Sequence, residues 1–263
     1  MLTVVKKEIK LVFLSVKYNI MRQMANPLSF VLNVLFMMLN NSAFLVEWAI
    51  FFTLKDSIGG YGFGEVCLLW GISAASFGLA HIFFHGAFKM PKMIEEGGLD
   101  QYLIVPRDTL MGAITSQTSI SAIGDLLYGL IVSFVFYHSI VNILLILLFS
   151  ILGAIIYTAF AIIINSLAFR FIKLSDFAEN IIGMFVTFSL YPEQIFDTVI
   201  KVILYILIPI GFAVYIPMDV LLEFNIINLL IVISYTIFIS LVAYYIFNRG
   251  LKRYSSSNLA VSR

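Results

Sequence analysis

Seven long apolar runs constrain this sequence more than any other feature. They cover approximately residues 28–54, 66–88, 110–137, 140–169, 177–191, 199–217 and 226–247. A helix needs about 20 apolar residues to cross a bilayer, so most of these runs are long enough. Hydrophobic residues make up 61% of the chain and charged residues only 12%, which is too little charge to cover a water-soluble surface. We therefore expect an all-α, polytopic membrane protein in which residues 1–263 form a single transmembrane domain.

Residues 1–27 have the pattern of a helix that lies on the membrane surface. Basic residues are spread along this segment, whereas a signal peptide would place them before one unbroken apolar run. Apolar residues fall between them at spacings of three and four, which forms one apolar stripe on a basic helix. They are Val5, Ile9, Val12, Phe13, Val16 and Ile20. We expect this helix to lie in the lipid interface rather than cross the membrane.

The distribution of basic residues predicts the orientation. Cytoplasmic loops of membrane proteins carry an excess of Lys and Arg. If both termini are cytoplasmic, 14 of the 16 basic residues lie inside, and only Lys55 and Lys201 lie outside. The inner set is Lys6, Lys7, Lys10, Lys17, Arg22, Lys89, Lys92, Arg107, Arg170, Lys173, Arg249, Lys252, Arg253 and Arg263. The reverse orientation would invert this bias, so we expect both termini in the cytoplasm.

Two cytoplasmic termini require an even number of crossings, so one of the seven runs must fail to cross. The run at 199–217 contains Pro209, Gly211 and Pro217, and proline kinks a helix because it lacks a backbone N–H. We expect residues 198–222 to form a re-entrant hairpin that enters and leaves on the outer side. As a helix, the run at 177–191 would be about 22 Å long against a core of about 30 Å, so we expect it to extend through Phe196. The prediction is six transmembrane helices, an interfacial N-terminal helix and a re-entrant outer hairpin before the last span.

The sequence contains no recognisable catalytic or cofactor-binding motif. A phosphate-binding loop needs a lysine after its glycines, but Glu65 follows the glycine-rich segment at 59–64. His81 and His85 are four residues apart without an obvious third ligand, so no metal site is expected. The net charge of +1 argues against nucleic acid as a partner. We expect no enzyme activity and no cofactor in this chain.

Three polar residues within the apolar runs are candidates for a translocation path. Asp125 lies midway along the third run, where a charge in hydrocarbon costs at least a few kcal/mol. Asn40 and Asn41 lie on the first run and could line a polar seam. The alternatives are structural, because Asp125 could be protonated or hydrogen-bond a neighbouring helix. The two asparagines could simply tie helices together.

The inner loop at 89–109 has the pattern of a segment that a cytosolic partner could bind. Pro91 and Pro106 bound it, and we expect a short helix on each side of Gly97-Gly98. Leu99, Tyr102 and Leu103 form an apolar patch at helical spacing. The alternative is an ordinary connection between two spans.

Three segments of the chain resemble the type 2 ABC export permeases, specifically the compact bacterial members of about this length. They are residues 98–107 (GLDQYLIVPR), 124–127 (GDLL) and 191–196 (YPEQIF). Together with the topology, this resemblance covers essentially the whole chain. It implies a multi-pass permease subunit of the bacterial inner membrane, which pairs with an identical or paralogous second permease.

The resemblance also implies export driven by two separate ABC ATPase subunits, which would use ATP and Mg²⁺ on the inner face. The N-terminal helix and the inner loop would contact these ATPases, and the cargo differs between members of the family. The residues expected at the ATPase contact are Glu95, Glu96, Gly97, Gly98, Leu99, Asp100, Tyr102, Leu103 and Arg107. The alternatives are a passive channel, a secondary transporter or, with less support, a lipid-modifying membrane enzyme.

Overall fold

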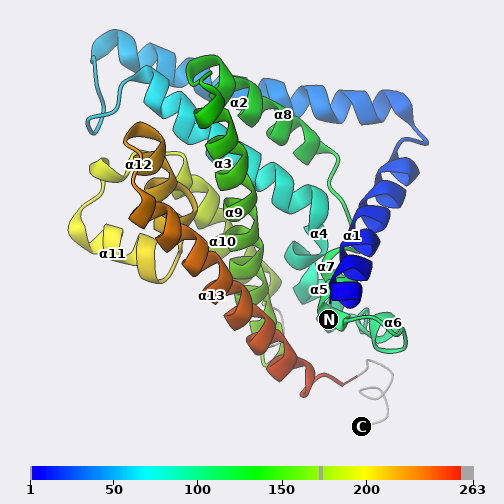
Figure 1. Cartoon of the computed structure of the whole chain (residues 1–263). Helices are drawn as coiled ribbons and strands as arrows, with labels where there is room; N and C mark the ends of the chain where they lie inside the picture. The colour runs from blue at the N-terminus through cyan, green and yellow to red at the C-terminus, as the bar shows by residue number, and fades with distance from the viewer. Residues whose placement is uncertain (1, 172–173, 256–263) are drawn as a thin grey trace.

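The computed structural model describes residues 2–171 and 174–255, so the predictions for Lys173 and Arg263 lie outside the described residues. Every regular element in this part of the chain is helical (Figure 1). The α-helices are α1 (Leu2–Gln23), α2 (Pro27–Leu54), α3 (Phe63–Phe83), α4 (His85–Phe88), α5 (Met90–Glu95), α6 (Asp100–Leu103), α7 (Thr109–Ile114), α8 (Ser121–Phe136), α9 (Ile140–Asn165), α10 (Ser175–Ser189), α11 (Thr198–Ile206), α12 (Ile216–Leu222) and α13 (Ile226–Leu251). Two 3₁₀ turns, η1 (Ser166–Phe169) and η2 (Glu193–Ile195), and one π-helical turn, η3 (Gly211–Tyr215), complete the set. The predicted all-α class is confirmed.

Among the described residues, four helical segments are long and apolar enough to cross a membrane: α2, α3, α13, and α9 together with η1. The pair α11 and η3–α12 would make a fifth if it forms one span. Helices α8 and α10 are shorter, at 16 and 15 residues. The chain is therefore a multi-pass membrane protein, and the count of six crossings stays a prediction.

Helix α3 lies at the centre of the bundle, packed between α8 and α9. Glycines allow its backbone to approach α8 closely. A Cβ on Gly71 would lie 2.8 Å from the carbonyl oxygen of Gly129, and one on Gly78 would lie 2.6 Å from the backbone nitrogen of Leu126. Small residues at a crossing are typical of membrane helices, because close backbone approach replaces the hydrophobic driving force that lipid removes. These crossings bring α8, and Asp125 on it, against the centre of the bundle.

The third apolar run is not one continuous helix as predicted. It consists of α7 and α8, separated by residues 115–120. The polar residues in this break bond to other segments instead of continuing a helix: the Thr118 hydroxyl donates to the Ile82 carbonyl at 2.9 Å, and the Ser119 amide donates to the His81 carbonyl at 3.0 Å. Such side chains favour local alternatives to the helical ladder. Asp125 consequently lies near the start of α8 rather than midway along a span.

Two other predicted runs are shorter than expected. The run at 66–88 breaks at Phe84, between α3 and α4. The fifth run ends at Ser189 and does not continue as a helix through Phe196. Pro192, which cannot supply a backbone N–H, precedes the separate turn η2.

The segment at 198–222 is broken where the prolines and glycine predict it. Helix α11 and the unit η3–α12 meet at 84°, across residues 207–210, which include Pro209. The Tyr205 hydroxyl donates to a Glu193 carboxylate oxygen at 2.9 Å, and the Tyr215 hydroxyl donates to the Phe188 carbonyl at 2.9 Å. These bonds hold the bent pair against η2 and the end of α10. The bend fits either a broken span or a re-entrant hairpin.

Helix α1 packs its predicted apolar stripe partly against the protein. Val12 and Val16 are buried, and Val16 packs against Ile82 and Ala122. At its end, the Gln23 side-chain amide donates to the Thr118 carbonyl at 2.8 Å. The basic residues of the helix are exposed, as an amphipathic surface helix requires.

Candidate functional site

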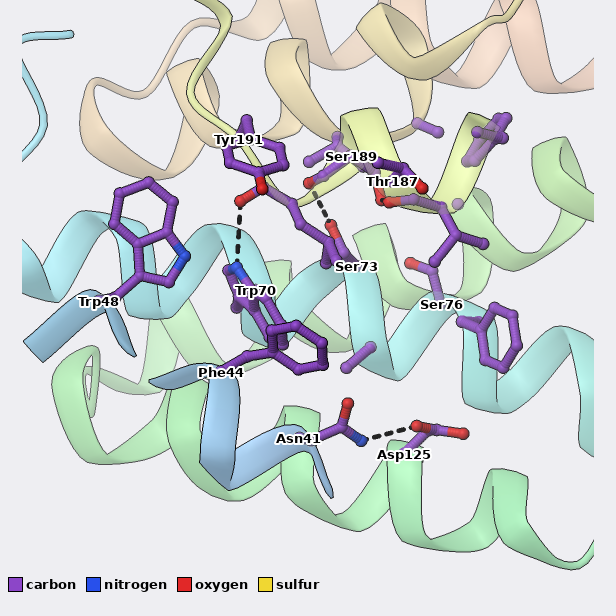
Figure 2. A pocket seen from close by; sticks show the side chains of 18 of the residues that line it. Asn41, Phe44, Trp48, Trp70, Ser73, Ser76, Asp125, Thr187, Ser189 and Tyr191 are labelled. Atoms are coloured by element: carbon purple, nitrogen blue, oxygen red, sulfur yellow. Dashed lines mark hydrogen bonds between the residues drawn. The ribbon is translucent and has the colours of Figure 1, made fainter. Parts of the chain in front are cut away.

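A partly open cavity of about 650 Å³ lies among the helices, with α2, α3 and α10 as its main walls (Figure 2). Asp125 on α8, Gly153 and Tyr157 on α9, and Ala213 and Val214 on η3 also line it, together with residues of the segments that connect the α-helices: Ile58, Leu190, Tyr191 and Ile195. Segments between residues 37 and 214 therefore meet around this one space.

The floor of the cavity holds a buried polar pair. The Asn41 side-chain amide donates to Oδ1 of Asp125 at 2.7 Å, and both side chains are nearly inaccessible to solvent (Figure 2). The second carboxylate oxygen of Asp125, Oδ2, is buried without a hydrogen-bond partner, and so is the Ser76 hydroxyl on the facing wall. A buried polar atom without a partner is costly and therefore requires an explanation.

The end of α10 is fastened to α3 by two hydrogen bonds beside the cavity. The Ser73 hydroxyl donates to the Ser189 carbonyl at 2.9 Å, and the Trp70 indole N–H donates to the Leu190 carbonyl at 3.0 Å. The last carbonyls of a helix have no partner within it, so these side chains satisfy groups that would otherwise be unpaired. The bonds hold this wall in place against α3.

Aromatic rings make up much of the remaining lining. Phe44 and Trp70 lie with ring centroids 5.1 Å apart, and Trp48 and Tyr191 lie 5.9 Å apart. The exposed members Phe44, Phe51 and Tyr191 are at the mouth, whereas Tyr157 is buried in the interior. The full aromatic set is Phe44, Trp48, Phe51, Trp70, Phe77, Tyr157, Phe185 and Tyr191.

The structure brings the three predicted path residues to this cavity, although they differ in burial. Asn41 and Asp125 are buried and bonded to each other, while Asn40 is exposed. Ser73 and Ser76 are site residues that the sequence patterns above do not single out. Two serines three residues apart in the second apolar run share a helix face, and this spacing was a signal that could have found them.

The predicted inner loop has the expected form of two short helices, α5 and α6, around Gly97-Gly98. The backbone bend lies at Gly97, whose φ of +75° is in the left-handed region that favours glycine. Gly98 is not in that region, and a Cβ on it would have its nearest neighbour, the Met93 carbonyl oxygen, at 3.4 Å.

The loop is bonded to three separate parts of the chain. Nε of Arg107 lies 3.1 Å from a Glu8 carboxylate oxygen on α1, in a largely buried ion pair. The Tyr254 hydroxyl, just after α13, donates to Oδ1 of Asp100 at 2.9 Å. Before α10, the Leu174 amide donates to Oε1 of Glu95 at 3.3 Å. A displacement of the loop would therefore act on α1, α10 and α13 together.

The loop residues predicted to contact a partner differ in accessibility. Leu99 is fully buried within the chain, and Tyr102 is half-buried against Gly112. Leu103, the third residue of the predicted apolar patch, is exposed, and so are the neighbouring Ile104 and Val105. Glu96 is exposed and forms a surface ion pair with Lys92 at 3.7 Å.

Comparison with known proteins identifies the family. The family described as "ABC-2 family transporter protein" matches residues 35–258, which include the cavity and the inner loop. No curated protein and no solved structure matches the chain. Permeases of this family are transport components of the membrane that work with ABC ATPase subunits and are not themselves catalytic. With most of its length matched and apolar helices of membrane-spanning length, this multi-pass membrane protein belongs to the ABC-2 transporter family.

Proposed function

We propose that this chain is the permease subunit of an ATP-driven exporter of the bacterial inner membrane. It forms the translocation path with a second permease, and separate ATPase subunits that use ATP and Mg²⁺ power it from the cytoplasmic side. The observation that carries the proposal is the inner loop, where a short exposed apolar segment belongs to a loop bonded to α1, α10 and α13. Family membership supplies the class of partner.

The loop is suited to pass a displacement from a partner to the helices. Leu103, Ile104 and Val105 offer apolar anchors, and such anchors usually dominate the energy of a contact. Glu96 and Lys92, elsewhere in the same loop, add exposed charges, which mainly affect the rate and orientation of binding. The buried Leu99 holds the loop in the core, so movement of the anchors moves the helices behind them.

The second permease packs against α2 in this proposal. Asn41 is the one buried residue of this helix, and large apolar side chains project from the helix along its length. Phe44 and Phe51, on the same helix, are exposed at the mouth of the cavity. A second permease on this face would close the open side of the cavity and complete a path, and lipid would cover the rest.

Co-expression with candidate P-loop ATPase subunits from the same genome tests the proposal. We expect the full-length chain to co-purify with its ATPase as a complex of two permeases and two ATPases. In proteoliposomes, ATP should drive transport toward the face opposite the ATPases. Replacing Ile104 with Ser should weaken ATPase binding, whereas Ile140→Ser, a change at another strongly exposed isoleucine that lies outside the loop and the cavity, should not.

Transport that runs without ATP, or down a gradient through the chain alone, would identify a channel or a secondary transporter. Equal ATPase binding by both isoleucine variants would show that the loop is only a connector.

A further inference from the structure

The residues that line the cavity indicate which charge its ligand carries. Its lining contains two carboxylates, Asp125 and Glu47, and among the described residues that line it there is no Lys, Arg or His. Asp125 is at the buried floor, and Glu47 is on an exposed part of α2. An anionic ligand would meet only repulsion from these groups, whereas a cation would meet attraction at both depths.

The geometry of Asp125 points to a missing partner with positive charge. Asn41 satisfies one carboxylate oxygen, while Oδ2 is buried with no hydrogen-bond partner. Asp125 is 5% exposed, so water does not substitute freely for that partner. An opposite charge nearby favours the ionised form of a carboxylate, so a cation in the cavity would compensate the buried negative charge of Asp125.

The aromatic lining completes this arrangement. Eight lining residues are aromatic, and they include the pairs Phe44–Trp70 and Trp48–Tyr191 (Figure 2). The faces of aromatic rings attract cations, and aromatic cages are a known way to bind quaternary ammonium groups. The same rings also accept the apolar body of a ligand. A cavity of about 650 Å³ is within the range of small-molecule sites.

We infer that the cavity binds a lipophilic organic cation, such as a quaternary ammonium or phosphonium compound, with its charge toward Asp125 and its apolar groups against the aromatic rings. The inference rests on the proposed function, since it names the class of substrate that the permease would carry. A neutral lipid chain would use the rings but leave the carboxylate unsatisfied, and is therefore the weaker occupant.

Two ions of the same size and shape, tetraphenylphosphonium and tetraphenylborate, separate charge from hydrophobicity. The only two tryptophans of the chain, Trp48 and Trp70, both line the cavity, so their fluorescence reports occupancy directly. We expect saturable quenching by the phosphonium with the full-length chain in nanodiscs. We expect at least about tenfold weaker saturable binding of the borate, because the attraction to the Asp125 carboxylate becomes repulsion.

Variants at the carboxylate test the assignment. Asp125→Asn should weaken phosphonium binding about tenfold, because it removes the attraction between the two charges, and Asp125→Glu should retain most of it. Asp56→Asn, which removes a carboxylate from an exposed loop outside the cavity, is the matched control and should bind like the parent chain. If Asp125→Asn fails to fold, the comparison of the two ions on the parent chain still decides the question.

Equal affinity for the two ions, or an Asp125→Asn variant that binds the phosphonium as tightly as the parent, would overturn the inference. Co-purification with the ATPase tests the proposed function independently of this binding result. A chain that assembles with ATPases and transports another compound, but does not prefer the cation, refutes only the substrate class. A chain that does not assemble with any ATPase refutes the proposed function whatever it binds.

Discussion

Gly97 is the residue on which the shape of the inner loop depends. Its φ of +75° is unfavourable for any side chain with a Cβ, by roughly 1–2 kcal/mol. We expect Gly97→Ala to lower the thermal stability of the purified protein and to weaken ATPase binding. Gly98→Ala is the control, since the nearest contact of its Cβ would be at an ordinary 3.4 Å. Equal effects of the two substitutions, measured by thermal unfolding and co-purification, would contradict this assignment of the bend.

The hydrogen bond between Asn41 and Asp125 contributes to stability, because each side chain is the buried partner of the other. Removing one partner alone leaves the other buried and unpaired, at a cost of about 1–3 kcal/mol. We expect Asn41→Leu to destabilise the protein by about this amount. The double variant Asn41→Leu with Asp125→Leu should recover most of the loss, because no polar group then remains unpaired at this position. Thermal unfolding of the two variants measures this, and a double variant less stable than the single one would show that the pair itself holds the helices together.

At the scale of elements, the crossing of α3 and α8 depends on glycine. A Cβ on Gly129 would lie 2.5 Å from the backbone of α3, at Gly71 and Ala75, so even a methyl group forces the two helices apart. Gly183 on α10 has no atom within 4 Å of its would-be Cβ and serves as the matched helical control. We expect Gly129→Ala to destabilise the protein by more than about 1 kcal/mol, while Gly183→Ala is neutral or stabilising. Similar melting temperatures for the two variants would show that the crossing tolerates separation.

The bent pair of α11 and η3–α12 makes a second prediction at this scale. If it is re-entrant, both Lys201 and Asp219 face the outer side. Cysteines introduced at these positions, with the native buried Cys67 replaced by Ala, should both react with a membrane-impermeant maleimide added to intact cells. Labelling of position 219 only after the cells are opened would show that the pair crosses the membrane as one broken span.

For the whole molecule, the sequence predicted what hydrophobicity and backbone chemistry determine locally. Apolar length indicated the long helices, and proline with glycine indicated the break near Pro209. It did not predict the break at residues 115–120, because Thr118 and Ser119 bond to Ile82 and His81, which are far away in sequence. The cavity was predictable only in part for the same reason. Asp125 stood out as a charge among apolar residues, whereas Ser76 and the aromatic walls become a site only when α2, α3 and α10 meet.

The bond between Tyr254 and Asp100 joins the C-terminal end of α13 to the inner loop, at the end of the molecule where α1 also begins (Figure 1). Burial and this hydrogen bond raise the pKa of Tyr254 to about 12 from an ordinary value of 10.0. Because the pKa is raised in the folded protein, the hydrogen bond contributes its whole stabilisation below about pH 10. This stabilisation is lost as the pH rises through about 12. At physiological pH the hydroxyl therefore remains a donor.

Removing this hydroxyl should separate ATP hydrolysis from transport. Tyr254→Phe keeps the ring against Phe169 but removes the bond to Asp100, so movement of the loop is transmitted less completely to α13. We expect ATPase binding and hydrolysis to persist in the reconstituted complex while transport per ATP falls severalfold. Tyr245→Phe, which removes only a bond within α13 to Arg249, should leave that ratio unchanged. Unchanged coupling in Tyr254→Phe would mean that the loop acts through its other connections, to α1 through Arg107 and Glu8 and to α10 through Glu95.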